Sequence, residues 1–133
     1  MTTTGSLREP SRRHERLDEE WFHLFALDSI VAELRTESSY RSRGRAGVTL
    51  LKTKQLRVVL EAARQEARIE EHTIEGPAFV QVLEGSLRLA SGDETRIAHA
   101  GEMVSIPHDQ PREMRAEQDS AFLWALSLEP SST

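Results

Sequence analysis

The sequence predicts an all-β domain, an antiparallel sandwich or barrel, preceded by a short helix and an N-terminal arm. From about residue 48 onward, apolar and polar residues alternate with a period of two, as they do in strands that bury one face. Glycine-containing turns interrupt this alternation at roughly eight-residue intervals, a spacing typical of all-β sandwiches and barrels. The length of 133 residues fits one domain.

The N-terminal part has a different composition. Residues 1–20 are polar and hold too few apolar side chains to offset the entropy of ordering, so they are expected to form a flexible, disordered arm. An apolar segment plus a short helix is expected over 21–47. Asp28 is expected to cap this helix at about 29–37, where apolar residues recur at helical spacing. Residues 38–47 are expected to form a loop.

Short strands account for the rest of the domain, from residue 48 to residue 128, and a tail over 129–133 follows. In the last strand, Phe122, Trp124 and Leu126 are expected to share one buried face, because side chains alternate across a strand. The expected strands are 48–52, 56–63, 78–83, 87–90, 95–98, 103–106, 112–116 and 121–128.

Charge and composition exclude several classes of function. With 17 Lys plus Arg against 22 Asp plus Glu, the net charge is −5, and an acidic chain without a basic stripe is a poor nucleic-acid binder. Arg41, Arg43 and Arg45 are therefore expected to lie in a solvated loop. The chain has no cysteine, which excludes disulfides and thiolate-held metals. No apolar run approaches the ~20 residues of a membrane helix and no signal peptide is evident, so a cytoplasmic protein is expected.

Two segments resemble the motifs of the cupin family. The segment from Ala67 to Gly85 is similar to the first motif, which ends in a glycine turn. The segment from Gly101 to Arg112 is similar to the second, with Pro107 at matching spacing. The resemblance covers about 48–128 and implies a small single-domain bacterial cupin, with the double-stranded β-helix, a jelly-roll-like barrel, as its fold.

The resemblance also implies where the family's metal ligands would fall. Matching the motifs places the first histidine ligand at His72. The other positions, which hold a histidine, a glutamate and a histidine in the family, fall on Ile74, Ala78 and Arg112. Isoleucine and alanine have no lone pair to donate, and arginine puts a permanent positive charge where a cation would bind. His72 is then the one remaining metal candidate, and no metal ion or other cofactor is expected.

The motif positions and strand alternation together define a candidate ligand pocket inside the barrel. An inward-pointing Arg112 is costly to bury without a partner and could receive a carboxylate or phosphate. Alternatively, Arg112 reaches the barrel mouth or pairs with Glu75. The candidate pocket residues are His72, Ile74, Ala78, Val80, Val82, Arg112 and Met114.

Three functional hypotheses follow, of which the first is favoured. The first is a small-molecule-binding or sensory module that takes a small anionic or apolar ligand. The second is a cupin enzyme, either a metal-dependent oxygenase or isomerase with non-standard ligands or a metal-free enzyme with His72 as acid or base. The third is an interaction module with a vestigial pocket, which an interior filled by Met114, Phe122 and Trp124 would favour. No catalytic pair is evident, because adjacent carboxylates in a strand face opposite sides.

A homodimer is expected. The apolar side chains between Trp21 and Leu27 must be buried somewhere, and a barrel of about 80 residues is a small core on its own. The resemblance to small cupins also implies a homodimer, which forms by sheet packing or by strand exchange at the N-terminus. Twofold symmetry is also the commonest arrangement of oligomers.

Overall fold

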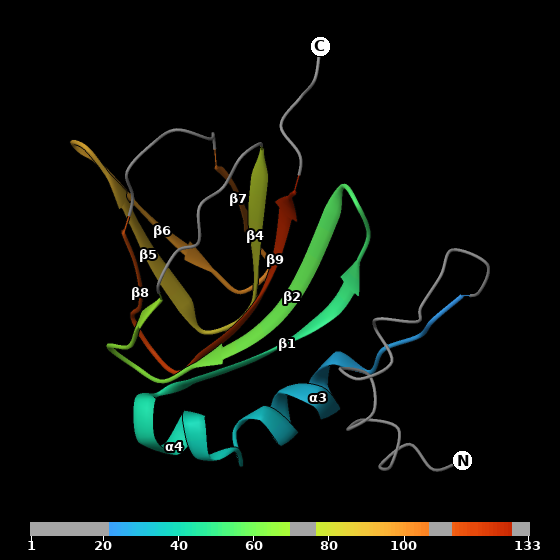
Figure 1. The fold of residues 1–133 in the computed structure, drawn as a ribbon. Helices are drawn as coiled ribbons and strands as arrows, with labels where there is room; N and C mark the ends of the chain where they lie inside the picture. The colour runs from blue at the N-terminus through green and yellow to red at the C-terminus, as the bar shows by residue number, and fades with distance from the viewer. Residues whose placement is uncertain (1–21, 70–76, 107–112, 129–133) are drawn as a thin grey trace.

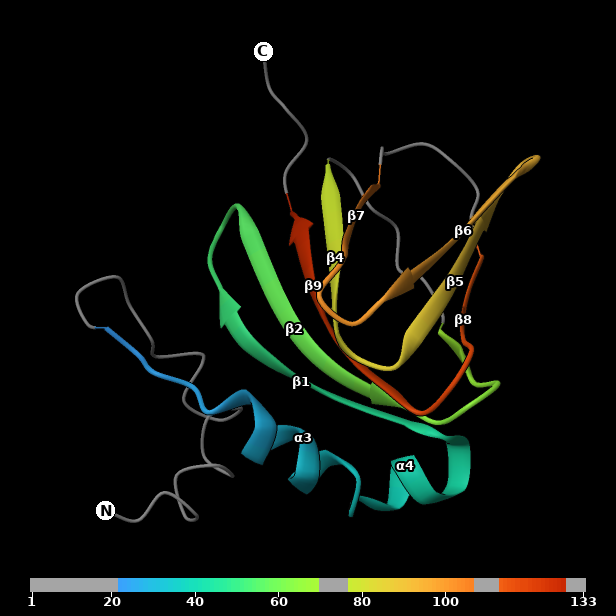
Figure 2. The same cartoon turned by 180° about the vertical axis from the view of Figure 1, so that it is seen from behind.

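The fold consists of two β-sheets that face each other, with two short helices on the outside of one sheet (Figures 1 and 2). The computed structural model describes residues 22–69, 77–106 and 113–128. The predicted arm over 1–20 and the predicted tail over 129–133 lie outside these residues. The architecture is the double-stranded β-helix, so the all-β expectation is confirmed.

The larger sheet has five strands in the order β1-β2-β9-β4-β7, and the smaller has four in the order β3-β8-β5-β6. The strand pairings within both sheets are antiparallel. Strand β9, the last strand of the described residues, lies between β2 and β4 in the middle of the larger sheet. The strands are β1 (Arg45–Lys52), β2 (Leu56–Ala63), β3 (Arg68–Ile69), β4 (Ala78–Glu84), β5 (Ser86–Ser91), β6 (Glu94–His99), β7 (Met103–Ile106), β8 (Glu113–Ala116) and β9 (Ser120–Ser127).

Strand alternation divides the apolar side chains of the larger sheet between two clusters. On its inner face, which looks toward the smaller sheet, β9 contributes Phe122, Trp124 and Leu126 to the main core, as the sequence predicts. On its outer face, Leu60 of β2 and Ala121 of β9 belong to a second cluster beneath the helices. The larger sheet is therefore buried on both faces where the helices cover it.

Helix α3 (Leu27–Leu34) covers the outer face of β1 and β2. It buries Ile30, Val31 and Leu34, the residues whose spacing predicts a helix. The predicted bounds of 29–37 and the predicted cap at Asp28 are wrong. The helix begins earlier because Ala26 takes the N-cap position, and its carbonyl accepts from the amide of Ile30 at 3.1 Å. Asp28 instead lies in the first turn, where a negative charge is favourable.

The predicted loop over 38–47 is also wrong, because it contains helix α4 (Ser38–Arg43) and the start of β1. Tyr40 anchors this short helix, since its side chain is buried in the second cluster. Gly44 ends the helix in the left-handed conformation, with φ +81°, and its amide donates to the carbonyl of Tyr40 at 2.9 Å. Within the described residues, no helix is both long and apolar enough to cross a membrane.

Candidate functional site

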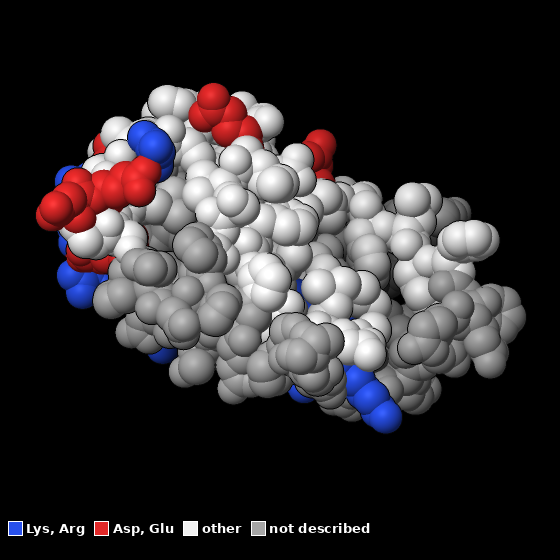
Figure 3. Space-filling view, turned by 90° about the horizontal axis from the view of Figure 1, so that it is seen from above, with Lys and Arg blue, Asp and Glu red and all other residues white. Residues whose placement is uncertain are grey.

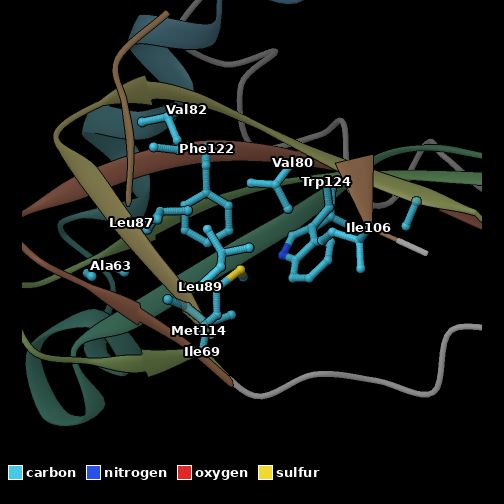
Figure 4. Close-up of a cluster of buried hydrophobic side chains, with 14 of the residues drawn as sticks. Ala63, Ile69, Val80, Val82, Leu87, Leu89, Ile106, Met114, Phe122 and Trp124 are labelled. Atoms are coloured by element: carbon cyan, nitrogen blue, oxygen red, sulfur yellow. The ribbon is translucent and has the colours of Figure 1, made fainter. Parts of the chain in front are cut away.

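The predicted pocket residues that the structure describes lie in the main core. Ala78, Val80, Val82 and Met114 are all buried there in one cluster with Phe122 and Trp124. Figure 4 shows how Val80, Val82 and Met114 lie around the two aromatic rings. This part of the interior is filled by side chains, which is the arrangement that favours an interaction module. His72, Ile74 and Arg112 lie outside the described residues.

An open pocket of about 540 Å³ lies beside this filled interior. Its floor is the inner face of β1, β2 and β9, and residues around α4 and β3 complete its border. None of the seven residues predicted from the motifs is among its described lining. The pocket is lined by Glu37, Ser39, Arg43, Arg45, Ala46, Gly47, Val48, Thr49, Arg57, Val59, Glu61, Arg68, Trp124 and Leu126.

The alternation of β2 places its charged residues on this floor. Arg57, Val59 and Glu61 are spaced two apart, so they share the inner face of the strand. Val59 lies opposite Trp124 of β9, which supplies the apolar part of the floor. Glu61 lies opposite Gly47 of β1. A Cβ atom at Gly47 would come within 2.9 Å of Cγ of Glu61, so the missing side chain leaves the space that Glu61 occupies.

Glu61 is a buried carboxylate, with 7% of its surface exposed. Nη2 of Arg45 lies 3.4 Å from its Oε1 atom and donates a hydrogen bond to it. Burial raises the pKa of Glu61, and the positive charges of Arg45 and Arg57 offset only part of that effect. The pocket therefore contains a carboxyl group that takes up a proton more readily than an exposed one, although Arg45 and Arg57 stabilise its charged form in part.

Arg57 is the least satisfied cation of the floor. Its Nη2 atom lies 3.4 Å from Oγ1 of Thr49, a long hydrogen bond. Its Nε atom is buried and has no hydrogen-bond partner among the described residues. A buried donor without an acceptor costs about 1–3 kcal/mol. The guanidinium of Arg57 is therefore suited to receive an acceptor from a ligand.

The pocket has more positive than negative groups, although the whole chain is acidic. Four arginines and two glutamates are among its described lining residues. Arg68, at the border, is ion-paired with Glu113 at 2.9 Å and is well exposed. On the face shown in Figure 3, charged side chains lie mainly toward the margins of the described surface and its centre is largely uncharged. The described lining of the pocket is therefore more positive than the chain as a whole.

The comparisons with known proteins identify the fold family. The profile of the cupin domain matches residues 57–128. The chain belongs to the cupin family. No curated protein matches the sequence.

Several solved structures share the architecture at low sequence identity. A conserved protein of unknown function from Streptococcus pyogenes is 19% identical, with a TM-score of 0.67 over 87% of this chain and 95% of that chain. A cupin superfamily protein from Desulfitobacterium hafniense is 13% identical, with a TM-score of 0.67 over 85% of this chain and 95% of that one. KdgF from a Halomonas species is 21% identical, with a TM-score of 0.57 over 66% and 82%. These similarities establish the fold.

The described residues of this cupin do not fit the family's metal site. Ala78, which takes the position of the glutamate ligand, has no donor atom and lies in the main core. Across 22–69, 77–106 and 113–128, no group of three or more His, Asp or Glu side chains could hold a metal ion. His99 lies in this region, but it is exposed and its Nδ1 atom is 3.4 Å from a carboxylate oxygen of Glu102.

The residues that line the open pocket were not predicted from the sequence. Arg45 was expected in a solvated loop, but it begins β1 and pairs with buried Glu61. One sequence pattern could have predicted the pocket: along the 56–63 strand, Arg57 and Glu61 lie on the same face as Val59, on either side of it. A strand face that mixes charged and apolar residues is typical of a wet or ligand-lined interior.

Glu61→Gln is expected to remove a pH dependence of stability. The pKa of Glu61 is raised in the folded protein. There is therefore a pH range, starting near the ordinary value of 4.5, in which the folded state binds this proton more tightly than the unfolded state does. The contribution of Glu61 to the free energy of unfolding is therefore largest below this range and decreases as the pH rises through it. Urea unfolding of both proteins between about pH 4 and pH 8 measures the difference. If the free energy of unfolding of the wild type minus that of Glu61→Gln stays constant or increases with pH, burial is not the dominant effect on the pKa of Glu61.

Proposed function

We propose that this cupin is a small-molecule-binding module whose open pocket takes a small anion. The observation that carries the proposal is that Arg57 lines a pocket of about 540 Å³ with a poorly paired guanidinium: its Nη2 atom makes a 3.4 Å hydrogen bond to Thr49, and its buried Nε atom has no partner among the described residues. This volume lies within the range of about 300–1,000 Å³ that is usual for ligand pockets. A carboxylate fits the planar donors of a guanidinium, and apolar side chains beside the charge supply further contact area.

Calorimetric titration with benzoate tests the proposal. Benzoate combines a carboxylate for Arg57 with a ring for the apolar floor at Val59 and Trp124. Arg57→Ala is expected to weaken binding by about tenfold or more, because hydrogen bonds to charged groups contribute about 1.5–3 kcal/mol.

Arg88→Ala is the matched control, because Arg88 is an exposed arginine on β5 of the other sheet. This variant is expected to bind benzoate as the wild type does. Equal affinities of the Arg57 and Arg88 variants, or no binding of benzoate to the wild type, would contradict the proposal.

An interaction module is the second candidate, and the filled interior favours it. Phe122 and Trp124 pack edge to face, with ring centroids 6.4 Å apart, and they occupy the space between the sheets together with Met114. Under this alternative the arginines of the pocket contact an acidic partner protein. The pocket would then hold no small-molecule ligand, and benzoate is expected not to bind the wild type, so the benzoate titration separates the two functions.

We also propose that the chain pairs with a second copy. Phe22 and Leu24 are fully exposed, at 106% and 98% of their reference surface, on an extended segment before α3. The outer face of the larger sheet also exposes apolar side chains beyond the helices, including Phe79 and Met103. In a twofold dimer, the segment with Phe22 and Leu24 of each copy can pack on the exposed sheet face of the other copy, so that both apolar surfaces are buried.

Replacing both Phe22 and Leu24 with serine is expected to convert a dimer into a monomer. Burying two large apolar side chains contributes about 1.5–3 kcal/mol each, and twofold symmetry doubles the effect. Sedimentation velocity is expected to give twice the 15.0 kDa chain mass for the wild type and the single mass for the variant. A wild-type protein that sediments as a monomer at all concentrations would contradict the dimer.

A further inference from the structure

We infer that the open pocket selects a monoanionic carboxylate that carries an apolar ring and, at its far end, a neutral hydroxyl group. This inference rests on the proposed function and adds to it the identity of the second polar contact. The carboxylate binds Arg57, the ring lies on Val59 and Trp124, and the hydroxyl donates to Glu61.

The spacing of the floor sets the length of the ligand. Arg57 and Glu61 are four residues apart on one strand, which separates their Cα atoms by about 13 Å. Val59 lies between them on the same face, with Trp124 opposite it on the next strand. The two polar side chains therefore start at opposite ends of an apolar strip, and the guanidinium of Arg57 comes close enough to act on the carboxylate of Glu61. A single ring with polar groups at its two ends matches this arrangement.

Trp124 gives the strip a fixed surface. The indole is 5% exposed and packs against Phe122 at an interplanar angle of 65°, so its orientation is held by the core. Val59 and Leu126, its neighbours on the floor, are apolar and nearly buried as well. An aromatic ring gains contact area and an aromatic pairing on such a surface.

Glu61 has one carboxylate oxygen to offer the ligand. Arg45 donates to Oε1, and Oε2 has no hydrogen bond with any described residue. Because a carboxylate only accepts hydrogen bonds, the ligand must provide a donor at this end. The free oxygen therefore distinguishes a hydroxylated ligand from its unsubstituted analogue.

The charge balance favours a hydroxyl over an ammonium group as that donor. Arg45 and Arg57 carry two positive charges near Glu61, and both act on its carboxylate. A ligand with one carboxylate and a neutral hydroxyl neutralises the remaining positive charge. A zwitterion with an ammonium group would leave that charge uncompensated in a desolvated site, which is costly.

Titrations with benzoate and 4-hydroxybenzoate test the inference, and the readout is the ratio of the two affinities. The wild type is expected to prefer 4-hydroxybenzoate by about tenfold, the effect of one charge-assisted hydrogen bond. Glu61→Leu is expected to bring the ratio close to one while benzoate still binds. Arg88→Ala is expected to keep the wild-type ratio. If Glu61→Leu does not fold, Glu61→Gln serves instead, with a preference reduced at least about threefold because its neutral amide is a weaker acceptor.

The outcomes separate this inference from the proposed function. Benzoate binding that depends on Arg57, with no preference for the hydroxyl compound, would overturn the inference alone. A preference that persists undiminished in the folded Glu61 variant would also overturn it. An absence of binding by both compounds would overturn the inference and the proposed function together.

Discussion

Replacing Phe122 with alanine is expected to lower the free energy of unfolding by about 3–5 kcal/mol. Phe122 is 0% exposed and lies at the centre of the main core, between the inner faces of the two sheets (Figure 4). The substitution removes a large apolar side chain and leaves a cavity that a sandwich of two hydrogen-bonded sheets can only partly close. Equilibrium unfolding in urea, followed by circular dichroism, measures the loss.

Phe79→Ala is the matched control for this prediction. Phe79 lies on the outer face of the same sheet and is 36% exposed, so its removal creates no enclosed cavity. Its cost is expected to be well below that of Phe122→Ala. Equal costs for the two variants would contradict the assignment of Phe122 to the centre of the core.

Gly85→Ala is expected to destabilise the protein by about 2–5 kcal/mol, through backbone strain and through overlap with neighbouring atoms. Gly85 joins β4 to β5 with φ +79°, a left-handed conformation that alanine adopts at a cost. An added Cβ would lie 2.4 Å from the carbonyl oxygen of Asp119 and 2.4 Å from Oγ of Ser120. Ser120 cannot move freely, because its buried hydroxyl accepts from the amide of Ser86 at 3.0 Å.

A matched substitution at Gly92 distinguishes backbone strain from overlap with neighbouring atoms. It has a similar φ of +60°, but an added Cβ would meet no atom within 4 Å. Gly92→Ala is therefore expected to cost only the conformational part, about 1–2 kcal/mol. Thermal or urea unfolding of both variants gives the comparison. A Gly92 variant as unstable as the Gly85 variant would show that contact with Ser120 contributes nothing.

The strands were predictable from the sequence because their physical cause is local. Alternation along 56–63 and 121–128 reflects the two faces of each strand, which in β2 and β9 belong to different buried clusters. The turns between strands use residues such as Gly85 that tolerate unusual backbone angles. The helix α4 was not predictable in the same way. Its six residues include five polar ones, and it exists because Tyr40 reaches a cluster assembled from distant parts of the chain.

The candidate site was harder to predict than the fold, because it depends on pairings between strands. Motif positions predicted Val80, Val82 and Met114 as pocket residues, and in the structure their side chains are buried in the main core. Arg45 and Glu61 are far apart in the sequence, and only the register of β1 against β2 brings them together across Gly47. The roles of His72, Ile74 and Arg112 remain predictions.

The central claim is that a small anion binds over Trp124 beside Arg57, and ¹⁹F NMR of fluorinated tryptophan tests it most directly. The chain has two tryptophans, so a Trp21→Phe background labelled with 5-fluorotryptophan reports on Trp124 alone. Titration with benzoate is expected to shift this single resonance to saturation, with the affinity found by calorimetry, and Arg57→Ala is expected to move the midpoint to a benzoate concentration about tenfold or more higher. A resonance that does not move while benzoate is bound would place the ligand elsewhere and contradict the account.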